Sequence, residues 1–319
     1  MKPYLINLND PDDCLGKYVD EDRDRGFIKE HLDLLVVALG PEEVHEVTRS
    51  VFYKGNEINN HMQQFGYETM FVRGGEIEVT VRGRKCLVTD GDILHFGCYN
   101  AHRMRWLKDT PWVGFFHNMN IHQPMADKML INENYPELTD AEIAEFYRES
   151  YDCYYLAEPV AVEVPKSEIL EIRQPEFAFA TFTFDGVTMR QKIGRWETNG
   201  MYEVWEFNMD DGYFTRYDNP SPKASIYYIT DGNVRFKVFN KEFLAPKDSI
   251  VHIPPYAIHS YQSEGASVMF DAYGSALLHD YVSDLKSYET YEPEKLKDKG
   301  FVDSLKKKYN YYITESGRL

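Results

Sequence analysis

Short strand-like segments separated by tight turns fill residues 55–106, and this pattern constrains the fold more than any other feature. Ile77, Val79 and Val81 alternate with polar residues, which is the period of a half-buried strand. Gly-Gly and Asp-Gly pairs mark turns at intervals of roughly ten residues. Segments of strand composition also lie at 32–39, 44–53, 102–107 and 112–122. Many short strands with this spacing are typical of a β-sandwich or β-barrel.

The same pattern returns in the second half of the chain. Gly75 corresponds to Gly232 and His95 to His252, each pair being 157 residues apart. Further pairs at the same offset are Glu46-Val47 with Glu203-Val204, Ile77 with Val234, Val79 with Phe236, 93–96 with 250–253, and His102 with His259. A constant offset from about residue 46 to residue 102 indicates two copies of one barrel.

The segment between the two copies has a different character. Thr139 followed by Glu142 is a capping box, and the apolar residues after it recur at helical spacing, so we predict a helix over 140–151. Residues 156–168 contain two prolines and are expected to form a linker or an edge strand. We therefore predict two domains, 1–155 and 156–319, with short helices in the charged tail after about residue 277.

Four side chains of the first copy are suited to one metal site. His61 and Gln63 point to the same side of a strand, because residues two apart share a face. Glu68 opens the next strand after a short turn, and His102 comes from another strand. Two imidazoles and a carboxylate form the ligand set of Fe(II) oxygenases and also suit Mn, Ni or Zn. Gln63 is expected to be a fourth, weaker ligand or a donor that orients substrate or water.

The second copy lacks most of this set. Three of the four ligand positions hold other residue types at the offset of 157, namely Asp218, Pro220 and Ser225. Only His102 keeps a counterpart, His259. We expect no metal there, since one histidine binds a divalent ion weakly. The second barrel is expected to support the first and to make subunit contacts, or to retain a vestigial small-molecule pocket.

These residues also resemble a known family. The first copy contains a cupin-like motif, with Gly55, His61, Gln63, Glu68 and Gly74 at near-family spacing, and a second motif runs from Gly91 to His102. Each copy is similar to a cupin barrel, and the chain is similar to a bicupin over about residues 30–120 and 175–275.

Three positions depart from the family pattern. Gln63 replaces the second histidine of the first motif, Gly97 and Tyr99 stand in place of proline and glycine, and Trp106 replaces the last asparagine. The resemblance implies an all-β fold of two tandem cupin-type barrels, of the double-stranded β-helix or jelly-roll kind, with a few short helices. It also implies an architecture like that of quercetinase-type dioxygenases, with the second domain degenerate.

Three functions remain open from the sequence. The first is a dioxygenase that uses one divalent transition metal per chain and acts on a small organic molecule. The second is a non-redox metal enzyme, an isomerase, lyase or hydrolase, which would need an acid or base such as Tyr67, Tyr99 or Glu46. The third is a non-catalytic cupin that only binds a small molecule.

The composition argues against nucleic acid and membranes as partners of this protein. The formal net charge of −17 disfavours nucleic acid and anionic membrane surfaces, which both require basic patches. The N-terminus has no apolar signal segment, and no run of 18 apolar residues occurs. Four cysteines without C-x-x-C spacing favour a reducing compartment. We therefore expect a cytoplasmic protein. The cupin resemblance and the Tyr-rich tail imply a homodimer.

Overall fold

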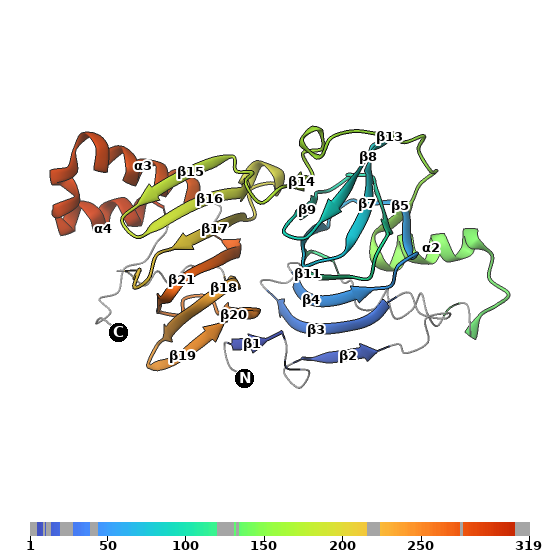
Figure 1. The fold of residues 1–319 in the computed structure, drawn as a ribbon, viewed down its shortest axis with the longest axis horizontal. Coiled ribbons are helices and arrows are strands. Elements are labelled where there is room, and N and C mark those ends of the chain that lie inside the picture. The colour runs from blue at the N-terminus through green and yellow to red at the C-terminus, as the bar shows by residue number, and fades with distance from the viewer. Residues whose placement is uncertain are drawn as a thin grey trace. The chain divides into compact units, whose positions relative to one another are not determined.

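The computed structural model describes residues 5–8, 10, 14–19, 28–38, 44–119, 131, 134–215, 224–274 and 277–309. The chain forms two compact units, Pro11–Phe177, and Met1–Asp10 together with Ala178–Leu319 (Figure 1). Mainly antiparallel sheets make up both units, which confirms the all-β prediction of two tandem jelly-roll barrels. No helix in the described ranges is long and apolar enough to cross a membrane.

Two sheets build the first unit. The seven-stranded sheet has the order β14-β9-β6-β11-β4-β3-β2, with β2 Gly16–Val19, β3 Ile28–Ala38, β4 Val44–Phe52, β6 Tyr67–Val72, β9 Ile93–Phe96, β11 Thr110–His117 and β14 Ile172–Arg173. The six-stranded sheet has the order β12-β5-β10-β7-β8-β13, with β5 Glu57–Gln63, β7 Glu76–Val81, β8 Arg84–Thr89, β10 His102–Trp106, β12 Cys153–Tyr155 and β13 Val162–Glu163.

The core of the first unit comes from alternate residues of these strands. Met70 and Val72 on β6 are fully buried with Met104 and Trp106 on β10. The Trp106 ring stacks on Phe52 with ring centroids 4.2 Å apart. Because side chains two apart share a face, these residues fix which side of each strand faces the barrel interior.

The segment after the first barrel is helical and then extended. Helix α2 (Asp140–Tyr151) has the predicted bounds, and the Thr139 hydroxyl accepts a hydrogen bond from the Glu142 amide as the capping box requires. The predicted edge strand is confirmed by β13, which pairs with β8, and the 3-10 helix η2 (Lys166–Glu168) follows.

The compact units divide near residue 177, and not at the predicted boundary between 155 and 156. β13 and β14 lie after that boundary but hydrogen-bond to β8 and β9 of the first barrel. β1 (Leu5–Asn7) pairs with β20 (Ser249–Ile253) of the second unit. Long-range strand pairing therefore decides the division, and the local sequence pattern does not encode it.

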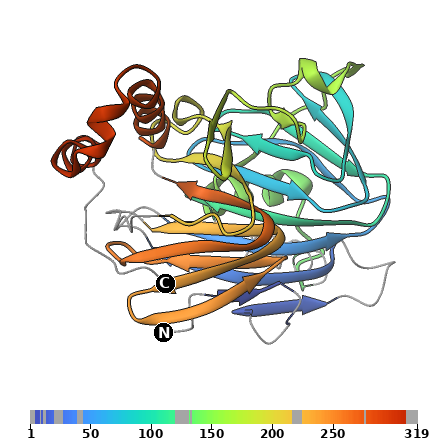
Figure 2. The same ribbon diagram turned by 60° about the vertical axis from the view of Figure 1, so that its left-hand side comes forward.

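The described residues of the second unit form an eight-stranded sheet, two α-helices and two short 3-10 helices. The strand order is β1-β20-β18-β21-β17-β16-β15, and β19 pairs with β18. The remaining elements are β15 Ala180–Phe184, β16 Val187–Ile193, η3 Arg195–Glu197, β17 Glu203–Met209, β18 Ser225–Val238, β19 Lys241–Pro246, β21 His259–Gly274, α3 Leu278–Tyr291, η4 Pro293–Lys297 and α4 Lys299–Lys308. Figure 2 shows α3 and α4 side by side at one end of this unit. The predicted tail helices are confirmed up to residue 308, and the rest of that segment lies outside the described residues.

The internal repeat is confirmed at the level of register. Equivalent cross-strand pairs recur at the offset of 157 residues: Glu68–Phe96 with Ser225–Ile253, and His102–Val81 with His259–Val238. Tyr99 and Tyr256, which also correspond, both adopt a φ of 60°. Matching register and matching turn geometry show that the two copies share one fold in detail.

Two histidines, one buried and one half-buried, should make the stability of the second unit depend on pH. Burial lowers the pKa of His252 and His259 below the usual 6.5, so both stay neutral in the folded state. The unfolded chain binds protons as pH falls through 6.5, which favours unfolding. We expect the melting temperature to be highest above pH 6.5 and to fall below it, as a pH series of thermal melts would measure. In the His252→Gln/His259→Gln double variant, the melting temperature should depend less on pH between about pH 7 and 5. If the melting temperature of the variant falls with pH as steeply as that of the wild type, the two histidines do not cause the dependence.

Candidate metal centre

Three predicted ligands converge inside the first barrel. His61 on β5 and His102 on β10 are direct cross-strand partners in the six-stranded sheet, and Glu68 enters from β6 of the facing sheet. Their ligand atoms all lie within 4.8 Å of one another. The Glu68 carboxylate is 3.9 Å from His61 Nε2 and 3.5 Å from His102 Nε2, and all three side chains are buried.

Backbone carbonyls orient both imidazoles. Nδ1 of His61 lies 2.9 Å from the Asn59 carbonyl oxygen, and Nδ1 of His102 lies 2.9 Å from the Asn100 carbonyl oxygen. Because a carbonyl oxygen only accepts, each Nδ1 carries the hydrogen and each Nε2 presents a lone pair in the neutral ring. The Phe96 ring also stacks on the His102 imidazole, with centroids 3.7 Å apart.

This arrangement fits a divalent cation. Nε2 of His102 is buried without a hydrogen-bond partner and faces the Glu68 carboxylate. Two acceptors facing each other in a buried site repel unless a proton or a metal ion lies between them. The fixed Nδ1–H bonds are also the arrangement usual for metal-binding histidines.

Glu68 is held as a carboxylate. Burial acts to raise its pKa, but the positive charge of His102 and His61, when their imidazoles are protonated, and a hydrogen bond from Gln63 together bring the pKa below its usual value. An ionised carboxylate beside two imidazole lone pairs is the donor set that Mn, Fe, Ni and Zn accept.

Gln63 lies beside the three converging residues and contacts one of them. Its amide nitrogen donates a 2.7 Å hydrogen bond to Glu68 Oε1. This bond fixes the rotation of the carboxylate. Direct ligation through the Gln63 amide oxygen stays a prediction.

Loss of the Gln63 hydrogen bond should weaken metal binding without abolishing it. For Gln63→Ala we expect metal affinity to fall by roughly 10- to 100-fold, the cost typical of losing a partner that orients a ligand. Titration against a competing chelator measures this change. Gln64→Ala is the control, because Gln64 is the next residue and lies beyond the end of β5. Equal affinities of the two variants would contradict the orienting role.

The three predicted acid or base candidates do not all point to the same side of the sheet. Phe116 on β11 is the cross-strand partner of both Glu68 and Glu46, so buried Glu46 shares the inner face of the sheet with Glu68. Tyr67 points to the opposite face, where its ring contacts His95 and His117. Tyr99 is 59% exposed. Of the three candidates, Glu46 alone faces the barrel interior.

Two further residues beside the centre come from a strand that sequence reasoning did not associate with it. In β12, Cys153 is the cross-strand partner of Gln63, and Tyr155 that of His61. The Tyr155 ring centroid lies 6.3 Å from that of His61. Burial, together with the adjacent Cys153 thiol, raises the pKa of Tyr155 above its usual value, so the phenol keeps its proton. The Cys-Tyr-Tyr segment has strand composition, but nothing local indicates that it pairs with β5.

The second barrel presents different groups at the same positions. Ser225 replaces Glu68, and Asp218 and Pro220 lie outside the described residues. His259 keeps the Nδ1 contact with the carbonyl oxygen two residues earlier, at 2.9 Å. Its Nε2 lies 3.3 Å from the Tyr227 hydroxyl, so this imidazole has a neutral hydrogen-bond partner in place of a carboxylate.

Comparisons with known proteins bear on the fold. The model of the AraC-like ligand binding domain matches residues 203–292 in the second unit. A search of curated proteins finds no significant match.

Several solved structures resemble the whole chain. Oxalate decarboxylase from Lactobacillus farciminis, in a formate complex, is 12% identical with a TM-score of 0.55, covering 93% of this chain and 96% of that one. Oxalate decarboxylase from Bacillus subtilis is 14% identical with a TM-score of 0.52, covering 85% and 76%. Salicylate 1,2-dioxygenase from Pseudoaminobacter salicylatoxidans is 11% identical with a TM-score of 0.50, covering 71% and 67%. This chain therefore has the bicupin fold, with a second barrel that is degenerate at the metal-ligand positions.

Proposed function

We propose that this protein is a metal-dependent enzyme whose first barrel binds one divalent transition metal and acts on a small organic molecule as a dioxygenase. The observation that supports this most directly is the convergence of His61, Glu68 and His102, with imidazole lone pairs directed at a buried carboxylate. Three protein ligands leave coordination positions open. The bound metal supplies Lewis acidity and, as iron or manganese, one-electron chemistry.

The residues around the centre would have separate tasks. Gln63 holds the Glu68 carboxylate in position through its 2.7 Å hydrogen bond. Apolar Met70 and Met104 line the same interior and keep water from the ligands. Glu46, on the inner face of β4, is the group placed to accept a proton from a substrate. Tyr155 is placed to donate a hydrogen bond, since its phenol stays protonated.

A second candidate is a metal-dependent lyase that decarboxylates a small organic acid. It is favoured by the extent of the structural likeness, because the oxalate decarboxylase of Lactobacillus farciminis matches 93% of the chain and the salicylate dioxygenase 71%. Manganese is the first metal to test for it, since Mn(II) centres are named for the Bacillus subtilis oxalate decarboxylase.

Parallel assays with and without oxygen separate the two candidates. Protein loaded with Fe(II), Mn(II), Ni(II) or Zn(II) is incubated with a panel of small organic acids and phenols. Oxygen uptake coupled to substrate loss supports the dioxygenase, and carbon dioxide release without net oxygen consumption supports the decarboxylase. Glu68→Gln should abolish either reaction, whereas His259→Gln in the second barrel should retain it. Stabilisation by a panel compound without turnover under any metal would replace both with a binding role.

A further inference from the structure

The turn between β5 and β6, residues 64–66, joins the two sheets of the first barrel. Gln63 is the last residue of β5 in the six-stranded sheet, and Glu68 lies on β6 in the seven-stranded sheet. The hydrogen bond from Gln63 to Glu68 therefore spans the two sheets. Because no β-ladder joins β5 to β6 in the described residues, the conformation of this turn decides whether the two side chains meet.

One carboxylate from outside the barrel motif holds this turn. The backbone N–H groups of Gln64 and Phe65 both donate to Oδ2 of Asp152, each at 2.8 Å, across 88 and 87 residues of chain. Hydrogen bonds to a charged oxygen are stronger than those between neutral groups. Two of them on consecutive N–H groups tie the turn to the end of helix α2.

The strand that follows this aspartate extends the attachment. β12 begins at Cys153, the cross-strand partner of Gln63, and ends at Tyr155, the partner of His61. The Tyr99 N–H also donates a 2.7 Å hydrogen bond to the Gln63 carbonyl oxygen. The end of β5 is therefore held along its edge by β12, and the turn after it is held by the carboxylate.

Asp152 keeps a backbone conformation that glycine adopts without strain. It ends α2 with a φ of 54° and a ψ of 26°, in the left-handed region, and its N–H donates to the Tyr147 carbonyl oxygen. Glycine is the usual residue at such a helix end, because a side chain there costs conformational energy. Aspartate in its place indicates that the carboxylate contributes more than this strain costs.

The second copy repeats the helix without this anchor. Helix α4 ends at Lys308, which is 157 residues after Tyr151, the last residue of α2. The counterpart of Asp152 is Tyr309, whose φ of −104° is not left-handed and whose hydroxyl donates to Asp284 on α3. Neither the candidate ligand set nor the carboxylate anchor is thus repeated.

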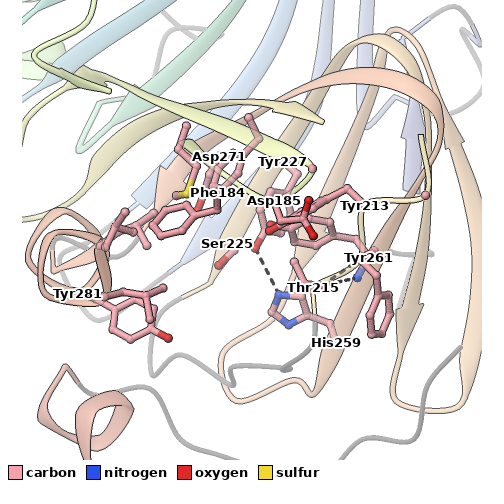
Figure 3. A pocket seen from close by; sticks show the side chains of 18 of the residues that line it. Phe184, Asp185, Tyr213, Thr215, Ser225, Tyr227, His259, Tyr261, Asp271 and Tyr281 are labelled. Carbon is pink, nitrogen blue, oxygen red and sulfur yellow. Dashed lines mark hydrogen bonds between the residues drawn. The ribbon is translucent and has the colours of Figure 1, made fainter. Parts of the chain in front are cut away.

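The second barrel also shows what equivalent register forms with other side chains. Ser225 and His259, the counterparts of Glu68 and His102, line a cavity of about 770 Å³ (Figure 3). In the first barrel the Glu68 carboxylate lies 3.5 Å from His102 Nε2. A side chain as long as glutamate reaches its partner only if its direction is fixed as well as its register, and contacts from outside the shared strands supply that direction.

We propose that Asp152 is a positioning residue of the candidate metal centre, whose carboxylate holds residues 64–66 so that Gln63 and Glu68 meet across the two sheets. For metal binding this rests on the proposed function, whereas the contact between the two side chains belongs to the metal-free chain as well. Without the carboxylate the turn is free to move, the hydrogen bond from Gln63 weakens, and the Glu68 carboxylate loses its fixed rotation.

Three variants separate the carboxylate from the backbone. Asp152→Gly removes both hydrogen bonds without strain, Asp152→Asn keeps an oxygen that accepts both, and Asp248→Gly repeats the first change at an aspartate of the second unit with a φ of 59°. NMR of the metal-free proteins should show the Gln64 and Phe65 amide protons of Asp152→Gly exchanging at least about 10-fold faster than in the wild type. The Gln63 side-chain amide should also exchange faster. Asp152→Asn should restore most of this protection, and Asp248→Gly should not alter it.

Titration with Co(II) against a chelator measures the consequence for the centre. We expect the affinity of Asp152→Gly to fall by about 10-fold, the lower end of the cost of losing an outer partner of the ligands. The visible absorption spectrum of bound Co(II) should change as well, because it reports the ligand arrangement. Asp152→Asn and Asp248→Gly should bind Co(II) like the wild type.

The two arms distinguish failure of the anchor from failure of the metal site. A wild type that binds no Co(II) refutes the proposed metal function, and exchange of the Gln63 amide then decides the positioning role alone. Unchanged Gln63 exchange in Asp152→Gly overturns the positioning role. Where the wild type binds Co(II), an unchanged affinity and spectrum in Asp152→Gly overturn it too.

Discussion

His102→Ala should remove the metal from this protein, whereas His259→Ala, its matched variant 157 residues later, should leave the metal in place. The wild type, purified without chelators, is expected to carry about one divalent transition metal per chain. His102 Nε2 is buried, has no hydrogen-bond partner and faces Glu68 at 3.5 Å, so its loss removes a direct ligand. Affinity should therefore fall by more than the roughly 10- to 100-fold that loss of an orienting partner costs.

Elemental analysis of the wild type and the two variants measures this directly. The two histidines occupy equivalent register positions and keep the same Nδ1 contact to a backbone carbonyl, so the structural cost of each substitution is matched. Glu68→Gln provides an independent arm, because it removes the negative charge and keeps the side-chain volume. A wild type without metal, or equal metal content in both histidine variants, would refute the assignment of the centre to the first barrel.

Gly75→Ala should destabilise the first barrel by about 2–5 kcal/mol, through a left-handed backbone and a steric clash together. Gly75 has a φ of +69°, and a Cβ there would lie 2.7 Å from the Asp109 carbonyl oxygen and 2.8 Å from Thr110 Cα. Gly232 repeats the feature in the second barrel, with a φ of +72° and the Ala266 carbonyl oxygen at 2.5 Å. Gly232→Ala should therefore cost a similar amount.

The chain offers controls that isolate the clash. Gly55 and Gly265 also have positive φ, +91° and +76°, but a Cβ at either meets nothing within 4 Å. Alanine at those positions should lower the unfolding free energy only by the strain of a left-handed backbone, about 1–2 kcal/mol. Urea denaturation of the four variants gives the unfolding free energies. Equal losses in all four would mean that the backbone conformation, and not the close approach of the neighbouring strand, makes glycine necessary.

Strand periodicity and local caps are encoded within short stretches of the sequence, and predictions based on them were accurate. The helix over 140–151 formed with the predicted bounds because its capping box and its apolar spacing act within one or two helical turns. His61, Glu68 and His102 converge because alternation assigns each to the inner face of its strand, and the motif spacing places the strands in a cupin order. The constant offset of the repeat determined that both halves share one fold.

Sequence reasoning was weaker where two distant segments must meet. The sequence pattern does not rank Glu46, Tyr67 and Tyr99 as acid or base candidates, and cross-strand register together with the exposure of Tyr99 separates them. The sequence does not connect Tyr155 with His61, because β12 follows β5 by about ninety residues and no local pattern encodes their pairing. It indicated the cavity of the second barrel only as the alternative of a vestigial pocket.

Local periodicity and repeated spacing were sufficient to predict the two-barrel fold, the degeneracy of the second copy and the convergence of His61, Glu68 and His102, whose role as metal ligands stays a prediction. What surrounds those residues depends on long-range packing. Pairing of β13 and β14 with the first barrel moved the division of the chain to residue 177. Packing of α3 and α4 against the second barrel made a cavity with a mixed polar and aromatic lining where the first barrel has the His61, Glu68 and His102 cluster. Such contacts join segments far apart in the chain, and their free energy depends on burial and shape that no local pattern records.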